Sequence, residues 1–229
     1  LAAITAAKVA YDDGTTTFEE LTHQIELLDE ALFGYMLSDP TGPVPSVTNT
    51  DKRYARGSGM AFGRFTYNLN GATLREAGFC YSTEKNPTVL EQRSTRYFEN
   101  NGRIYIMDNM TPATVYYARP YVLTEGYQVA YGDQIKIITI PKGGMTWSWN
   151  DGGSAEENER IRAAMKYGLE VWNMFMSLQG FHLTGNYGSG TPTADCSYGG
   201  WMRVGPNASY QKTGPILHEL GHAIGVGTH

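Results

Sequence analysis

The stretch from Thr213 to His229 constrains this chain more than any other, because it reads T-G-P-I-L-H-E-L-G-H-A-I-G-V-G-T-H. Side chains four residues apart lie on the same face of an α-helix. A helix here therefore places His218 and His222 one above the other, where two imidazoles can bind a single ion. Because H-E-x-x-H is a short motif, the competing interpretation is a helix whose histidines are solvated and bind nothing.

The flanking residues predict where this helix begins and ends. Thr213 or Gly214 can cap its start, and Pro215 suits its first turn. Gly225 suits a left-handed exit three residues after the second histidine. A separate apolar stripe is expected to bury the helix against a core, and it consists of Ile216, Leu220, Ala223 and Ile224.

Catalytic zinc usually takes three protein ligands and keeps a fourth position open. His229 is the expected third ligand, reached by turns of the chain at the glycines that follow the helix. Glu219 lies next to the ligand face, where a carboxylate can take a proton from water without being a ligand itself. The residues thus predict a Zn²⁺ site with His218, His222 and His229 as ligands and Glu219 as catalytic base.

This stretch resembles the metzincin branch of zinc peptidases, whose pattern is H-E-x-x-H-x-x-G-x-x-H followed by a methionine turn. The match runs through Gly225 and then departs. The family's third ligand would fall on Thr228, whereas the histidine comes one residue later at His229, where the sequence ends ahead of any methionine turn. The resemblance implies metal ligation by the two motif histidines and a general-base role for Glu219.

Composition limits the kinds of partner. Lys and Arg total 18 against 23 Asp and Glu, for a net charge of −5 without any block of like charges, which argues against a nucleic-acid surface. No apolar run is long enough to cross a bilayer, and Leu1 opens without a signal-like core, so a targeting segment is expected upstream or already removed. Cys80 and Cys196 make no recognisable disulfide framework and are expected to be free.

Residues 1–38 predict a helical hairpin that is broken by an Asp-Gly pair. Thr17 and Glu20 have the form of a capping box at the start of the second helix. The segment resembles the alanine-rich helical modules of secreted bacterial surface proteins, and we expect it to be a packing or spacer unit. The proline-rich run from Ser38 to Pro45 then marks a domain boundary.

Residues 46–141 show short β-type runs separated by turn residues, a spacing that favours a β-sandwich. The runs are Met60–Leu69, Ala77–Ser82, Arg103–Met107, Val115–Leu123 and Gln134–Ile140. The sequences Arg75–Thr83 and Met110–Arg119 resemble fibronectin type III domains of bacterial secreted proteins. The resemblance places Tyr116 at the corner position of that fold and Cys80 on a central strand. Such accessory domains hold other domains apart or bind cell-surface or extracellular partners.

Residues 145–229 begin with a short aromatic strand, after which Ser154 and Glu157 predict a capping box opening a long helix that closes at Gly180. A strand, Trp201–Val204, precedes the H-E-x-x-H helix. This order resembles the upper, N-terminal half of the metzincin catalytic domain, in which the strand ahead of the zinc helix is an edge that pairs with the substrate backbone. The expected substrate-binding residues are therefore Trp201, Met202, Arg203 and Val204, with an ordinary sheet edge as the alternative.

The predicted fold class is multidomain α+β, with a helical hairpin, a fibronectin type III-like β-sandwich and an incomplete α/β metzincin-like catalytic domain. The predicted function is a secreted or surface zinc endopeptidase that acts on a protein or peptide substrate. One alternative is a bacterial surface adhesion or glycan-binding protein with an inactive peptidase-like domain, although such a protein has no need to keep Glu219. Another keeps the enzyme but supplies a carboxylate ligand from beyond residue 229.

Overall fold

The computed structural model describes residues 1–14 and 16–227, and the chain divides into two compact units. The first unit comprises Leu1–Tyr54, Phe62–Met107 and Tyr116–Lys136, and the second comprises Ala55–Ala61, Asp108–Val115 and Ile137–His229. The predicted domain limits 1–38, 46–141 and 145–229 stay predictions. No helix in the described part of the chain is both long enough and apolar enough to cross a membrane.

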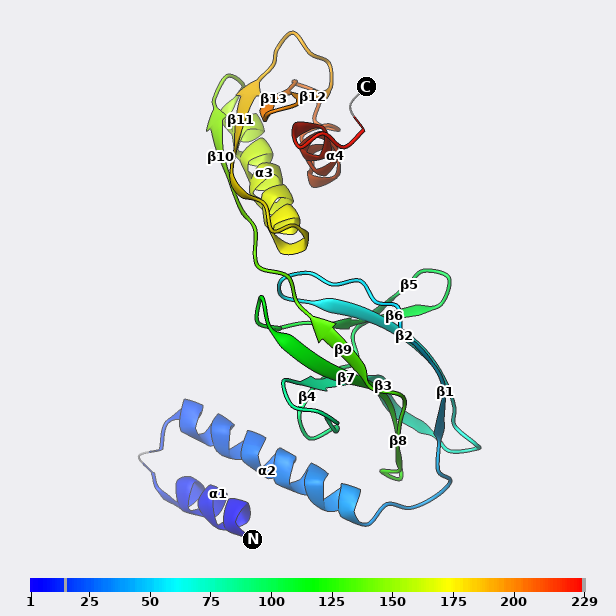
Figure 1. Cartoon of the computed structure of the whole chain (residues 1–229). Helices are drawn as coiled ribbons and strands as arrows, with labels where there is room; N and C mark the ends of the chain where they lie inside the picture. The colour runs from blue at the N-terminus through cyan, green and yellow to red at the C-terminus, as the bar shows by residue number, and fades with distance from the viewer. Residues whose placement is uncertain (15, 228–229) are drawn as a thin grey trace. The chain divides into compact units, whose positions relative to one another are not determined.

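The first unit opens with two helices, α1 (Ala2–Asp12) and α2 (Phe18–Ser38), which run side by side (Figure 1). The predicted capping box is confirmed, since Glu20 N–H donates to Thr17 Oγ1 at 3.2 Å and Thr17 N–H donates to the Glu20 carboxylate at 2.8 Å. One side of α2 packs on the β-strands through Phe33, whose ring lies 6.1 Å from that of Tyr127. Neither helix has a fully buried side chain among the described residues.

Nine strands form two sheets in the order β1-β2-β6-β5 and β4-β3-β7-β8, with β9 also paired to β7. The strands are β1 (Ser46–Asp51), β2 (Ala61–Asn68), β3 (Leu74–Ser82), β4 (Gln92–Ser94), β5 (Tyr97–Glu99), β6 (Arg103–Met107), β7 (Val115–Thr124), β8 (Val129–Tyr131) and β9 (Ile135–Ile138). The five predicted runs correspond to β2, β3, β6, β7 and β9, whereas the short edge strands gave no clear sequence pattern.

Aromatic side chains from the two sheets meet in the core of this sandwich. The ring of Phe65 on β2 lies 5.4 Å from Phe79 on β3 and 4.7 Å from Tyr105 on β6. Cys80 lies on β3, between β4 and β7, with no exposed surface, and Tyr116 is buried at the start of β7. The placement of Cys80 on a central strand is therefore confirmed, whereas the corner role of Tyr116 stays a prediction.

The C-terminal part of the second unit is a four-stranded sheet with two helices packed on one face (Figure 1). Its elements are β10 (Gly144–Asn150), α3 (Ala155–Phe175), β11 (Gln179–Tyr187), β12 (Ala194–Ser197), β13 (Trp201–Val204) and α4 (Thr213–Ala223). The sheet order is β10-β11-β13-β12, in which β10, β11 and β13 are parallel and β12 is antiparallel. The capping box of Ser154 and Glu157 is confirmed, but α3 ends at Phe175 and Gly180 lies in β11.

The prediction that Trp201–Val204 is a sheet edge is wrong. β13 pairs with β11 on one side, where Thr184 faces Trp201, and with β12 on the other, where Cys196 faces Met202. The open edge is β12, a four-residue strand with glycines on both sides that the sequence analysis did not predict. Because both sides of β13 are already hydrogen bonded, its backbone cannot add a substrate strand; the backbone of β12 can.

Candidate metal centre

The helix α4 presents one face to the core and another to solvent. Ile216, Leu220 and Ala223 have no exposed surface and pack with α3 and the sheet. On other sides of the same helix, His218 is exposed and His222 is partly exposed. The predicted apolar stripe is thus confirmed, apart from a partly buried Ile224, and it fixes the direction in which the histidines point.

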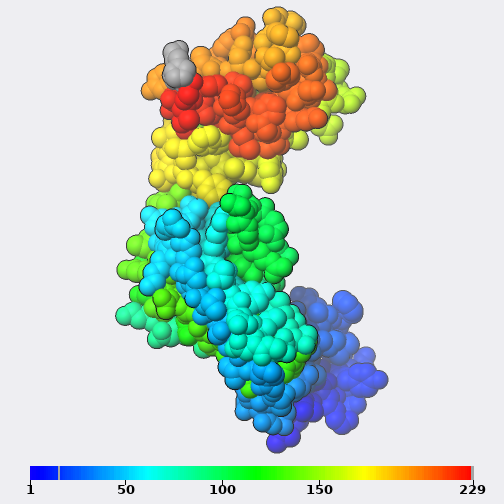
Figure 2. Space-filling view, turned by 90° about the vertical axis from the view of Figure 1, so that its right-hand side faces the viewer, coloured from blue at the N-terminus to red at the C-terminus, as the bar shows by residue number. Residues whose placement is uncertain are grey.

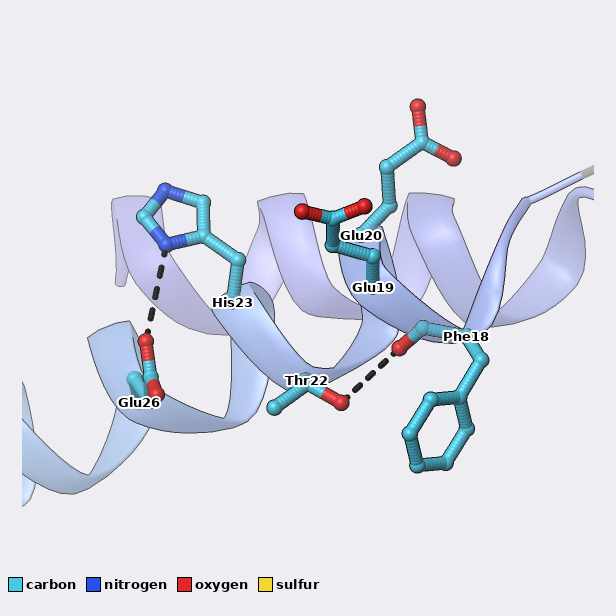
Figure 3. Close-up of a pocket in the computed structure, with 6 residues that line it drawn as sticks. All are labelled: Phe18, Glu19, Glu20, Thr22, His23 and Glu26. Atoms are coloured by element: carbon cyan, nitrogen blue, oxygen red, sulfur yellow. Dashed lines mark hydrogen bonds and ion pairs between the residues drawn. The ribbon is translucent and has the colours of Figure 1, made fainter. Parts of the chain in front are cut away.

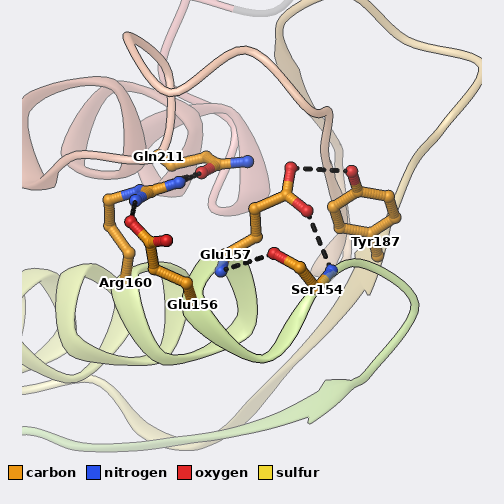
Figure 4. A network of polar contacts seen from close by, with 6 residues as sticks. All are labelled: Ser154, Glu156, Glu157, Arg160, Tyr187 and Gln211. Carbon is orange, nitrogen blue, oxygen red and sulfur yellow. Dashed lines mark hydrogen bonds and ion pairs between the residues drawn. The ribbon is translucent and has the colours of Figure 1, made fainter.

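The start of α4 is held by side chains of another helix rather than by its own cap. Lys212 occupies the N-cap position without a side-chain cap bond, so the expected cap at Thr213 or Gly214 is wrong. Instead, the buried Gln211 donates from Nε2 to the carbonyl of Gly205 at 2.8 Å and accepts from Arg160 Nε of α3 at 2.9 Å (Figure 4). This bracing fixes the loop that leads into α4.

The same network reaches the beginning of α3. Tyr187, at the end of β11, donates its hydroxyl to the Glu157 carboxylate at 3.0 Å (Figure 4). The Ser154 amide and hydroxyl bonds in the capping box, together with Tyr187, hold the pKa of Glu157 below its ordinary value. The sheet, α3 and the loop before α4 are therefore joined by charged and polar side chains as well as by the core.

The end of α4 has the geometry of a Schellman motif. Val226 N–H donates to Gly221 O at 2.8 Å, and Gly225 N–H donates to His222 O at 3.0 Å. Gly225 has φ of +90°, as its predicted left-handed role requires, although the helix itself already ends at Ala223. The end of the helix and the turn after it, coloured red, lie at the molecular surface (Figure 2).

The two histidines of α4 converge. Their Nε2 atoms are 3.1 Å apart, and their ring planes are perpendicular. Two nitrogens bound at about 2.0–2.1 Å to one tetrahedral zinc ion lie roughly 3.3 Å apart, so the pair needs almost no rearrangement to share an ion. The spacing also permits a hydrogen bond between the two rings, which is the competing interpretation.

The tautomer of His222 decides which of its nitrogens is free. Nδ1 lies 3.1 Å from the carbonyl oxygen of Val226, and a carbonyl can only accept a hydrogen bond. Nδ1 therefore carries the proton, which leaves the lone pair of the neutral ring on Nε2, directed at His218. A backbone acceptor on the far nitrogen is the arrangement that orients a metal-binding histidine.

Glu219 completes a compact donor group with the two histidines. One potential ligand atom from each of His218, Glu219 and His222 falls within 4.8 Å of the others. The strand β12 packs against α4, which brings the backbone amide of Cys196 near Glu219. Burial raises the pKa of Glu219, while the two histidines oppose that shift and Asp195 adds to it. The carboxylate thus lies close to both imidazoles, on the helix that packs against β12.

The remaining predicted residues do not gather at this point. Met202 and Val204 have no exposed surface and belong to the core, so neither can touch a substrate. Trp201 is 49% exposed, and the guanidinium of Arg203 lies over its ring and pairs with Asp195. His229 lies outside the described residues, and its predicted role as third ligand stays a prediction.

Other histidines and thiols of the described chain lack such a group. His23 lines a pocket on α2 with Phe18, Glu19, Glu20, Thr22 and Glu26, but its Nδ1 faces only the exposed Glu26 carboxylate at 3.8 Å (Figure 3). His182 bonds to the hydroxyls of Thr146 and Ser148. Burial raises the pKa of Cys196 to about 12, with Glu219 adding to the shift, so its thiol stays protonated. Within residues 1–14 and 16–227, only the α4 group assembles three metal-binding side chains.

Sequence reasoning missed the contribution of β12, including the Cys196 amide. β12 is only four residues long, and its burial runs from a buried Ala194 through partly buried Asp195 and Cys196 to an exposed Ser197, without a clear alternation. Glycines lie on both sides of β12, and glycines are typical of loops. A longer alternating run would be needed to distinguish such a strand from a loop by pattern alone.

No family model matches this chain, and no curated protein matches it. Solved structures that resemble it are fibronectin type III domains. The sixth such domain of human fibronectin type III domain containing protein 3 is 17% identical, with a TM-score of 0.31, over 52% of this chain and 98% of that one. Domains d3–d4 of the rat CD45 extracellular region are 14% identical, with a TM-score of 0.31, over 43% of this chain and 52% of that one.

A third similar structure, the fn3 domain of human contactin 1, is 12% identical, with a TM-score of 0.28, over 52% of this chain and 96% of that one. The sandwich is fibronectin type III-like in this sense. Nothing about activity, substrate or partner follows from similarities of this size.

Proposed function

We propose that the chain is part of a zinc-dependent endopeptidase that hydrolyses peptide bonds in protein or peptide substrates. The observation that carries this proposal is the convergence of the His218 and His222 Nε2 atoms to 3.1 Å beside the Glu219 carboxylate. A purely structural helix has no use for two imidazoles and a carboxylate gathered at one solvent-accessible point. Secretion or surface attachment remains part of the proposal.

The donor set fits zinc. Two imidazole nitrogens are borderline ligands of the kind zinc prefers, and the tautomer of His222 leaves the correct nitrogen available. His218 and His222 would hold the ion through Nε2, with His229 as the proposed third ligand. When bound, zinc supplies a Lewis acid that polarises a carbonyl and lowers the pKa of coordinated water to about 7.

Glu219 moves the proton in this proposal. Its carboxylate accepts a proton from the attacking water and passes it to the departing amine. Burial raises the pKa of Glu219, while the neighbouring His218 and His222 oppose that rise. Water attack and amine departure then use one side chain that stays within reach of both.

The open edge of β12 supplies a means of holding the substrate. An extended peptide can add to an unpaired strand through main-chain hydrogen bonds, which recognise any sequence. β12 packs against α4, the helix that carries Glu219. This replaces β13 as the proposed backbone-binding strand and keeps the substrate class, a protein or peptide, unchanged.

Replacing Glu219 by Gln tests the proposal. Glu219→Gln should keep zinc bound and lower the rate of casein cleavage by about 10²-fold or more, because general acid–base catalysis contributes that much. Glu170→Gln, an exposed change on α3, is the matched control and should cleave at the wild-type rate. Cleavage by Glu219→Gln at the wild-type rate would remove the proposed mechanism.

A further inference from the structure

Tyr198 is an exposed aromatic residue beside the metal centre. It follows β12 directly and is 76% exposed. A Cβ atom added to Gly225 would lie 3.4 and 3.6 Å from two carbons of the Tyr198 ring, so the ring lies over the backbone that leaves α4. Its hydroxyl has no hydrogen-bond partner among residues 1–14 and 16–227. The ring is therefore available to another molecule.

The turn that carries Tyr198 is fixed by backbone bonds. Gly199 N–H donates to the carbonyl of Ala223 at 2.9 Å, and Gly200 N–H donates to Ser197 O at 3.1 Å. Both glycines have positive φ, at +94° and +95°, which residues with a side chain rarely adopt. Ala223 directly follows His222. The turn is thus tied to the end of the metal helix, and the ring keeps its place without being buried.

The ring lies at one end of the proposed path of the substrate. Cys196, two residues before Tyr198, lies on β12, which packs against the helix that carries Glu219. On the other side, Gly225 belongs to the turn whose next residue, Val226, orients His222. A peptide extended along β12 toward the two histidines would therefore pass the Tyr198 ring close to the bond that is to be cut.

We propose that Tyr198 is a specificity-determining residue, which packs its ring against an apolar or aromatic side chain of the peptide next to the scissile bond. The inference rests on the proposed function and names the substrate feature that this site selects. A rigid tyrosine is suited to the task because it offers a large contact surface and loses little conformational entropy. Gly225 lies within van der Waals distance of the ring, so the turn after α4 supports one face of Tyr198.

Peptide binding tests this directly. Zinc-loaded protein carrying Glu219→Gln, which does not consume the probe, is titrated with fluorescent alanine-based peptides in which a single Phe is moved along the sequence. One Phe position should tighten binding about tenfold over the all-alanine peptide. Adding Tyr198→Ala should abolish that preference, whereas Tyr198→Phe should retain it, because the ring and not the hydroxyl makes the contact.

Two controls separate this role from a structural one. Tyr167→Ala removes a similarly exposed tyrosine from α3 and should keep the preference for Phe. Zinc content and the affinity for the all-alanine peptide should be unchanged in Tyr198→Ala. No preference for Phe at any position, or the same preference in Tyr198→Ala, would overturn the inference.

Cleavage by the protein with Glu219 intact distinguishes this inference from the proposed function. A protein that cleaves peptides with the same Phe preference before and after Tyr198→Ala contradicts only the role of Tyr198. A protein that binds the Phe peptide through Tyr198 but never cleaves it, even with zinc bound, contradicts only the peptidase proposal.

Discussion

The helix pairs α1–α2 and α3–α4 have similar sequence signals but different surroundings. Both α2 and α3 span 21 residues and begin with a complete capping box. Yet α1 and α2 bury no described side chain, and several of their large apolar residues are more than half exposed: Leu1, Ile4, Val9, Tyr11, Phe18, Ile25, Leu32 and Tyr35. In α3 and α4, by contrast, apolar residues form a shared core with the sheet.

The difference shows what the metal centre needs. A helix that packs on its neighbours only through partly buried side chains, as α2 does through Phe33, can present a histidine such as His23, but it does not fix two of them at a set separation from a third group. On α4, complete burial of Ile216 and Leu220 fixes the rotation of the helix, and the bond between Gln211 and Arg160 fixes its start. The capping box begins a helix, whereas burial of one face determines where the other face points.

The largest expected contrast is in the free energy of unfolding, when an isoleucine is replaced by alanine in each helix pair. Ile216→Ala removes a fully buried side chain and should lower the free energy of unfolding by about 2–5 kcal/mol. Ile25→Ala alters a side chain that is 58% exposed, and it should change the free energy of unfolding by no more than about 0.5 kcal/mol. Urea denaturation monitored by circular dichroism measures both. Equal losses would mean that the hairpin has a core of its own.

Zinc should stabilise the helix pair α3–α4 and leave the pair α1–α2 unchanged. If the ion binds only the folded centre, free zinc at a hundredfold excess over its Kd adds about 2.7 kcal/mol to the stability of the C-terminal elements. His218→Ala should lose this gain, and His23→Ala, an exposed histidine on α2, should keep it. Thermal unfolding with and without zinc provides the measurement. A full zinc effect in His218→Ala would place the binding site elsewhere.

The smallest contrast concerns the two capping boxes. Ser154→Ala and Thr17→Ala should each cost about 1 kcal/mol of helix stability. The Ser154 change should affect the stability of its core more, because α3 contributes fully buried side chains to the C-terminal core, whereas α2 touches the sandwich core only through partly buried side chains. Hydrogen exchange of the backbone amides in α2 and α3 measures the loss of stability in each helix separately. Equal propagation from both caps would contradict the distinction between the pairs.

The same boxes predict an acid dependence. Hydrogen bonds from Ser154 and Thr17 lower the pKa values of Glu157 and Glu20 below 4.5. A lowered pKa in the folded state stabilises it above the unfolded pKa, and this contribution disappears as the pH falls through the folded value. Both helices should therefore fray below about pH 4.5. Helix content that stays constant between pH 6 and pH 3 would show that the boxes are not formed.

Sequence alone predicted the features that local chemistry determines. The capping boxes at Thr17 and Ser154, the left-handed Gly225 and the shared face of His218 and His222 all depend on residues a few positions apart. They were correct because their partners lie within one or two helical turns.

Features that depend on distant partners escaped prediction. β12 is a strand because β13 pairs with it, and the sequence of its four residues does not predict that pairing. The start of α4 is braced by Arg160, 51 residues before Gln211 along the chain, so a cap was expected where none exists. The exposed face of α2 has the same period as the buried face of α3, and a periodic pattern does not reveal which face finds a partner.

Anomalous diffraction from crystals grown with zinc, recorded at the zinc absorption edge, tests the central claim most directly. The account predicts one strong peak between the Nε2 atoms of His218 and His222, about 2.0–2.1 Å from each, with Glu219 outside the coordination sphere. The same map identifies the third ligand, which is expected to be His229. A density map with the two rings hydrogen bonded to each other and no zinc peak between them would contradict the claim.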